Sequence, residues 1–563
     1  MAQQAGAPLK LFVARKIITM DPGWPTATAV AVRDGRIVSV GSLADLQPWL
    51  DRYPHDVAQT FADKVLLPGF IDPHQHPLVG GAALCLPTVA YYDTANPYGP
   101  PARGLKTKAE VIGRLRELAG QSQASDEPLL AWGYDAIALG GPLTKDDLDA
   151  VSTTRQVIVW DASEHDMFAN SAALRARNVT RESTRLAGVC TGPDGEPNGH
   201  FAGKPASLTY FADVFQSTLQ PDRIAKIMQY IVDLNRQGGV TTMADLALGI
   251  AAGVDVEAAL FARFFNDPRT PVRCLAVVDA GAMTRQHGDQ AVAAALALRS
   301  QNTDKFCFNG VKFFSDDAFV SLGMQVAAPG YTDGHGGLWI TDASAATEEQ
   351  MRPWWKAGFD IHVHTNGDAS QSALLDTLAA LQRDYPRFDH RFTFEHYGLS
   401  TPAQARRLKA LGAAVSANGY YLWLRGEINA AYLGTDRSYL ASRLRTLVDA
   451  GVPTAMHSDT PIAPPRPLLA AWIAVNRYGQ SGRVLAPAER VTLDQALRMI
   501  TIDAAYVLRL EDQVGSIEAG KLADFTVLEQ DPYEVPPEEL RDIPVWGTVF
   551  GGEVFPTSQI TGS

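Results

Sequence analysis

"LLPGFIDPHQHP" (residues 66–77) ends an apolar run with two histidines that are one residue apart. Because side chains alternate along a strand, His74 and His76 point to the same face. Two imidazoles on one face can hold a metal ion together. A pair of exposed loop histidines is the alternative for an isolated H-x-H, so the rest of the chain has to decide between them.

Short apolar runs alternate with helical patterns after this stretch. With a strand at 65–72 they predict eight strands, the others at 240–247, 272–280, 306–314, 359–368, 391–398, 413–419 and 453–459. Near-continuous apolar runs are typical of parallel strands that are covered on both faces. In the helix after 391–398, Ser400 or Thr401 can cap the start and Gly412 the end. The pattern predicts an α/β fold, a (β/α)8 TIM-like barrel.

Both ends of the chain have strand-like patterns. Residues 1–64 contain a hairpin signal at Asp34-Gly35, and residues 516–563 contain further strand-like runs. We expect these ends to pair in a small β-sandwich domain. The barrel is assigned to residues 65–475, with a long Gly-, Pro- and Asn-rich insertion at about 80–215 after its first strand. Residues 476–515 are expected to form a helical return segment.

The bulk composition excludes several classes of partner. The 563-residue chain has a net charge of −13, which argues against nucleic acid or an anionic membrane surface. No run approaches the roughly 20 apolar residues of a membrane span, and the first residues do not resemble a signal peptide. The cysteines form no C-x-x-C pair; they are Cys85, Cys190, Cys274 and Cys307. This placement of cysteines suits the reducing cytoplasm. The expected partner is a small-molecule substrate.

Polar residues recur at the carboxyl ends of the predicted strands. They are His74, His76, Lys312, His364, His396 and Asp459. Active sites of this barrel lie at that face, so only folding brings these residues together. The chain has only 12 histidines, and random placement would not favour strand ends so consistently.

Lys312 lies inside a strand that should be buried, where a bare ammonium is costly. The conventional interpretation is a lysine that extends to the barrel rim. The functional interpretation is a carbamate, formed with CO2, that bridges two metal ions. Zinc prefers such nitrogen and oxygen ligands, and two ions roughly 3.5–4 Å apart activate a bridging hydroxide.

Several residues in or beside the candidate ligand set allow more than one role. His364 is preferred over His362 as the ligand because it lies at the strand end, and His362 is expected to face the core or to lie behind the ligands. Alternation turns Glu395 away from His396. Asp459 could instead cap a turn before Pro461. His457 lies on the same face as Asp459, where it can contact substrate or that carboxylate.

The order H-x-H, Lys, His, His, Asp resembles the amidohydrolase superfamily. The phrases "PGFIDPHQH", "VKFF", "HVHTNGDA", "FEHYG", "HSDTP" and "GSIEAGKLADFTVL" are similar to its N-substituted formamide deformylase-like branch, amidohydrolase family 3. The resemblance implies a barrel, a β-sandwich from both termini and a mononuclear or binuclear zinc site. It implies that His74, His76 and Asp459 bind one metal, that His364 and His396 bind the second, and that Lys312 bridges them. Asp459 would act as general base and then acid.

The sequence departs from the pattern of this branch near the expected substrate. Its members usually carry a glutamate shortly after a "GEPTG"-like phrase, whereas "GEPNGHFAGKPA" offers His200 and Lys204. The residue two before the last aspartate is usually small, and here it is His457. These departures leave the ligand set intact and put the usual substrate in doubt.

Aromatic clusters favour a substrate with an apolar or aromatic group. The candidate substrate contacts are His165, His457, Trp132, Tyr420 and Trp423. The leading hypothesis is hydrolysis of an amide-type C–N bond, in an N-acyl or N-formyl amine, by a metal-activated hydroxide. An ester, lactone or carbamate hydrolase and a metal-assisted isomerase or lyase remain alternatives. Deamination and a non-catalytic scaffold are disfavoured, the latter because every ligand position is filled. Zinc could be replaced by another divalent metal, and the family suggests a homodimer.

Overall fold

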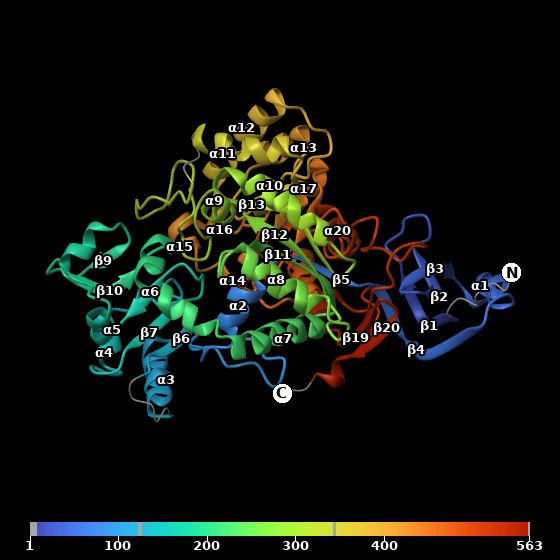
Figure 1. Ribbon diagram of the computed structural model, residues 1–563, viewed down its shortest axis with the longest axis horizontal. Helices are drawn as coiled ribbons and strands as arrows, with labels where there is room; N and C mark the ends of the chain where they lie inside the picture. Colours follow the sequence, from blue (N-terminus) through green and yellow to red (C-terminus); the bar gives the residue numbers. More distant parts are fainter. Residues whose placement is uncertain (1–7, 122–126, 342–344, 561–563) are drawn as a thin grey trace.

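The computed structural model describes residues 8–121, 127–341 and 345–560, and in these ranges it contains three β-sheets. An eight-stranded sheet forms the centre of the molecule. A seven-stranded sheet and a five-stranded sheet lie on opposite sides of it along the longest axis (Figure 1). No helix among the described residues has the length and apolar character needed to cross a membrane.

The eight-stranded sheet is the predicted barrel. Neighbouring strands are parallel and follow the order of the chain. The strands are β5 (Phe70–Gln75), β11 (Val240–Leu248), β12 (Arg273–Asp279), β13 (Phe306–Phe314), β14 (Ile361–Thr365), β15 (Thr393–His396), β16 (Ala414–Ala417) and β17 (Thr454–Met456). A parallel bridge between Gln75 and Thr460 joins the last strand to the first, so the sheet closes. The expected α/β barrel is therefore confirmed.

The predicted first strand at 65–72 is divided between two sheets at Gly69. Strand β4 (His55–Pro68) belongs to the seven-stranded sheet, and β5 begins at Phe70. A Cβ atom on Gly69 would lie 2.0 Å from Oγ1 of Thr241, so the chain passes too close to β11 for any larger residue. Because the last four residues of β4 and all of β5 are buried, the apolar run by itself could not reveal the division.

Helices between the strands cover the outside of the barrel (Figure 1). They include α7 (Pro221–Gln237), α8 (Val254–Phe265), α9 (Ala280–His287), α10 (Ala291–Leu298), α11 (Ala345–Lys356), α12 (Asp368–Asp384), α13 (Pro402–Leu411) and α17 (Leu444–Ala450). Helix α13 begins and ends as predicted. Thr401 caps its start through reciprocal bonds with Gln404, and Gly412 ends it with a φ of 73°.

Both ends of the chain build the seven-stranded sheet. Its remaining strands are β1 (Leu9–Ile18), β2 (Thr26–Arg33), β3 (Arg36–Gly41), β18 (Phe525–Leu528), β19 (Val545–Phe550) and β20 (Glu553–Pro556). The predicted hairpin turn at Asp34-Gly35 joins β2 to β3, with φ values of 52° and 73°. The sheet curls so that its edge strand β3 approaches the chain just before β18. There Ile37 donates a 2.9 Å hydrogen bond to the carbonyl of Lys521. An apolar core that includes Phe12 fills the curl.

The chain between β5 and β11 forms the five-stranded sheet. Its strands are β6 (Leu129–Tyr134), β7 (Val157–Asp161), β8 (Met167–Ala169), β9 (Val189–Thr191) and β10 (Pro197–Phe201). The helices of this insertion include α2 (Pro77–Leu84), α3 (Lys108–Gln121) and α6 (Lys204–Thr218). It follows the first barrel strand, as expected, and brings its own side chains to the carboxyl end of the barrel.

Candidate metal centre

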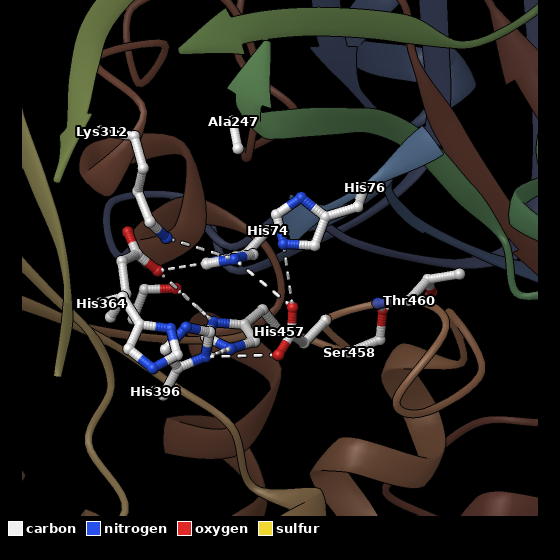
Figure 2. Close-up of polar contacts among 12 residues, drawn as sticks. His74, His76, Ala247, Lys312, His364, His396, His457, Ser458 and Thr460 are labelled. Atoms are coloured by element: carbon white, nitrogen blue, oxygen red, sulfur yellow. Dashed lines mark hydrogen bonds and ion pairs between the residues drawn. The ribbon is translucent and has the colours of Figure 1, made fainter. Parts of the chain in front are cut away.

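Histidine rings converge with Lys312 at the carboxyl end of the barrel (Figure 2), and Asp459 lies within 3.5 Å of three of them. The histidines are His74, His76, His364, His396 and His457. They come from β5, from the residue after it, from β14 and β15, and from the residue after β17. All six predicted metal ligands therefore lie in one region, because parallel strands of a barrel end at the same face.

His74, His76 and Asp459 form one compact group of donor atoms. Oδ1 of Asp459 lies 3.5 Å from Nε2 of His74 and 3.4 Å from Nε2 of His76. With Zn–N bonds of about 2.0–2.1 Å, two ligand atoms of a tetrahedral site are about 3.3–3.4 Å apart. The observed separations are close to that edge length, so the three side chains fit a metal ion of this kind.

Backbone geometry directs Asp459 to this group. Its φ is 57°, a left-handed conformation that is uncommon for aspartate. Asp72 of β5 holds the preceding residue: its carboxylate accepts hydrogen bonds from Oγ and N of Ser458, at 2.5 and 3.1 Å. The amide of Asp459 donates to the carbonyl of His74 at 3.0 Å. The alternative role of Asp459, capping a turn, does not account for its contacts with both imidazoles.

Glu395 lies inside the barrel. Alternation along the strand predicted that its side chain turns away from that of His396, and this prediction was wrong. His396 has a φ of 74°, so the strand ends there with a reversal of the usual alternation and both side chains reach the centre. Oε2 of Glu395 accepts a 2.7 Å hydrogen bond from Nδ1 of His74, and Oε1 accepts one of 2.7 Å from Nδ1 of His362. Glu395 thus orients His74, and His362 lies behind the centre.

A second group of donor atoms involves His457. One nitrogen of each of His74, His396 and His457 lies within 4.8 Å of the others, and all three side chains are buried. Nδ1 of His396 is 3.2 Å from Nε2 of His457 and 3.5 Å from Oδ2 of Asp459. The position of His457 within this cluster was not evident from the sequence, where it was a candidate substrate contact.

His364 lies beside His396, with ring centroids 4.3 Å apart. The side-chain amide of Asn366 donates to Nε2 of His364 at 3.0 Å, which leaves Nδ1 as the nitrogen available to another partner. Lys312 is fully buried, and its Nζ lies 3.5 Å from Nε2 of His74. The conventional alternative, a lysine extending to the rim, is therefore wrong for Lys312.

Burial sets the protonation of the centre. It lowers the pKa of His74, His364 and His396 well below the usual value, and the charge of Lys312 adds to this effect. Burial also lowers the pKa of Lys312, to about 8. Burial alone would raise the pKa of Asp459, but the hydrogen bond and charge of His76, together with the charges of His457 and Lys312, outweigh it and lower that pKa to about 2. Neutral imidazoles and an ionised carboxylate are the forms that bind metal.

The candidate substrate contacts fall in different places. His165, from the insertion, forms a buried ion pair with Asp317, which follows β13. Trp132 and Trp423 line one cavity of about 530 Å³ between the insertion and the loops after β16 and β17. Tyr420 is buried, and its hydroxyl donates to the carbonyls of Pro464 and Arg466. The hydroxyl of Tyr420 is therefore engaged in hydrogen bonds within the protein.

Another cleft, of about 780 Å³, reaches Lys312. Apolar side chains that line it include Leu208, Ile250, Phe314 and Ile340. Lys204 from the insertion lies at its edge, whereas His200 forms a 2.7 Å ion pair with Asp166 within the insertion sheet. Of the two residues that depart from the branch pattern, Lys204 is the one that borders a cleft reaching the centre.

A barrel with a buried histidine–carboxylate cluster at its carboxyl end indicates a class of protein, the metal-dependent hydrolases. The chain belongs to the amidohydrolase family, whose model matches residues 62–556.

Several relatives match nearly the whole chain. The N-substituted formamide deformylase of Arthrobacter pascens is 27% identical, over 96% of this chain and 97% of its own length. Protein LONG AFTER FAR-RED 3 of Arabidopsis thaliana is 26% identical, over 95% of this chain and 90% of its own length. These matches confirm the resemblance to the formamide deformylase-like branch.

Solved structures share the fold. A metal-dependent hydrolase of uncharacterised function from Pyrococcus horikoshii OT3 has a TM-score of 0.70, 19% identity, and coverage of 94% of this chain and 99% of its own. A second, from Pyrococcus furiosus, has a TM-score of 0.68 and 20% identity, with coverage of 93% and 100%.

Proposed function

We propose that this protein hydrolyses the amide-type C–N bond of an N-acyl or N-formyl amine that carries an apolar or aromatic group. The observation that carries the proposal is the position of Asp459, whose Oδ1 lies within 3.5 Å of nitrogens on both His74 and His76. The apolar cleft that reaches Lys312 supports an apolar substituent. The name of the Arthrobacter pascens relative supports the N-formyl class.

The proposed ligands are the six residues predicted from the sequence, with zinc as the expected metal and two ions per chain. When bound, such ions would polarise a carbonyl and lower the pKa of water. Lys312 would join them as a carbamate, formed when its neutral amine adds CO2 and releases a proton. Burial lowers the pKa of Lys312 to about 8, which increases the share of neutral amine.

Asp459 would move the proton in this reaction. Its pKa of about 2 keeps the carboxylate ionised at neutral pH, so it can accept a proton from the attacking water. The same proton then passes to the nitrogen of the leaving amine as the C–N bond breaks. One water is consumed, and the products are a carboxylic acid and an amine.

The first experiment is metal content per chain, by plasma mass spectrometry, on protein purified without chelator in bicarbonate buffer. About two ions per chain, together with turnover of N-formyl or N-acyl aromatic amines, is the expected result. Matched amide and ester substrates with the same acyl and aromatic groups separate the alternatives. Turnover of the ester alone would replace amide with ester hydrolysis, and a protein without metal after reconstitution would overturn the proposal.

A further inference from the structure

We infer that His457 is an additional nitrogen ligand of the metal centre and faces the same ion as His74 and His396, which assigns these two histidines to one ion where the resemblance implied two. The inference rests on the proposed function, because it concerns the metal that this function requires. It also changes the role of His457, which the sequence suggested as a substrate contact.

The geometry of the three nitrogens is that of a binding site. Nδ1 of His396 and Nε2 of His457 are 3.2 Å apart, close to the edge of about 3.3–3.4 Å expected between two zinc ligands. A nitrogen of His74 lies within 4.8 Å of both. The three rings come from β5, from β15 and from the residue after β17, which lie in one part of the closed sheet, so their nitrogens meet there.

Nδ1 of His457, the ring nitrogen that does not face His396, has polar neighbours, as is usual for a metal-binding histidine. Oγ of Ser416 lies 2.7 Å from Nδ1 of His457, and Oε2 of Glu395 lies 3.7 Å from the same nitrogen. The nearby carboxylate favours a proton on Nδ1, which leaves the lone pair on Nε2 directed at His396. Glu395 orients His74 by a 2.7 Å hydrogen bond, whereas it acts on His457 through its nearby charge.

The burial of His457 argues against direct contact with substrate. Its exposed fraction is 1%, and its amide donates to the carbonyl of Ala417 at 3.1 Å in continuation of the barrel sheet. A turn of the ring toward a cleft would break its contact with Oγ of Ser416. As a metal ligand, the ring of His457 would not have to move from its observed position.

One competing role has to be separated from ligation. His457 could only position His396, by accepting a hydrogen bond from its Nδ1. A glutamine at position 457 can accept that bond through its amide oxygen but is a poor zinc ligand. His457→Gln therefore separates ligation from positioning, and His457→Ala removes both.

The test measures metal binding instead of turnover. Wild type, His457→Ala and His457→Gln are compared by zinc stoichiometry, by affinity in competition with a chelator, and by the visible spectrum of the Co²⁺-substituted protein. His390→Ala is the matched control. His390 is also a buried barrel histidine, but its Nε2 lies 2.9 Å from the carbonyl of Leu411 and it is absent from the donor groups.

Both variants at position 457 are expected to bind one ion at least ~100-fold more weakly, beyond the range for residues that only support a ligand. Their Co²⁺ spectra should change, while His390→Ala keeps the affinity and spectrum of wild type. Wild-type affinity in His457→Gln, or an unchanged spectrum in both variants, would overturn the ligand role and leave the proposed function intact. A wild-type protein that binds no metal would overturn both.

Discussion

Nδ1 of His74 donates a hydrogen bond of 2.7 Å to Oε2 of Glu395, and neither side chain is exposed to solvent. This bond fixes the ring so that Nε2 faces Asp459, 3.5 Å away. A buried carboxylate of this kind orients a ligand and increases its basicity. The relationship makes Glu395 part of the centre, although it is not itself a predicted ligand.

Glu395→Gln should weaken metal binding by about 10- to 100-fold, because the amide is a weaker acceptor for His74 and His362. Chelator competition would measure the change. Glu518→Gln is the control, since Glu518 contacts Ser516 and Lys521 far from the barrel centre. Equal affinities in the two variants would contradict the orienting role of Glu395.

Asp459→Asn, compared with wild type after loading with excess metal, should lose turnover by about 10²- to 10⁴-fold, because an amide cannot accept the proton of water. Steady-state kinetics and metal content should be measured on the same preparation. Loss of activity with full metal content would separate proton transfer from binding. Turnover near that of wild type would remove Asp459 from the mechanism.

Lys312→Ala should lose activity and about half of the bound metal, because the proposed carbamate bridges two ions. Short carboxylic acids should restore part of the activity by occupying the vacated position. In wild type, ¹³C-labelled bicarbonate should produce a carbamate signal by NMR. Lys204→Ala, at the edge of the same cleft, should keep its metal. Full metal content in Lys312→Ala would contradict the bridge.

His200 offers a test of stability against pH. Burial alone would lower its pKa, but the ion pair with Asp166, with a smaller contribution from Cys190, outweighs this and raises the pKa to about 10. Because the folded pKa exceeds the unfolded value of about 6.5, the stabilisation is full below pH 6.5 and is lost as pH rises toward 10.

His200→Asn should therefore lower the free energy of unfolding by ~1.5–3 kcal/mol at pH 6, with a difference that shrinks toward pH 10. Denaturant titrations at several pH values would measure it. His335→Asn is the control, since the pair of His335 with Asp333 is exposed and should contribute ~1 kcal/mol or less. A pH-independent difference at position 200 would contradict the ion pair as its cause.

Gly69→Ala should destabilise the fold by ~1–3 kcal/mol, because the added Cβ would overlap the side chain of Thr241. Gly113→Ala is the opposite case. Gly113 lies in helix α3 with nothing near the added Cβ, so alanine should stabilise the helix by up to ~1 kcal/mol. Thermal unfolding of both variants would check the pair, and equal stability would contradict the close packing at Gly69.

Much of the barrel could be predicted because its signals are local. Apolar runs, helix caps such as Thr401 and turn residues such as Gly412 act within a few positions of the chain. The division at Gly69 could not be predicted, because a strand that enters the barrel and one that enters the terminal sheet are both apolar. Which sheet each joins depends on partners that are distant in sequence, here β11 and β18.

By itself, the sequence determined the barrel, the resemblance to amidohydrolases and the six candidate ligands, because strand ends carry polar residues at a shared face. The tertiary structure alone decided how His74, Glu395 and His457 are related. The left-handed backbone at His396 breaks the alternation that a strand pattern assumes, so Glu395 and His396 both face the centre. His457 meets His396 because β15 and β17 both pair with β16, a contact between residues 61 positions apart.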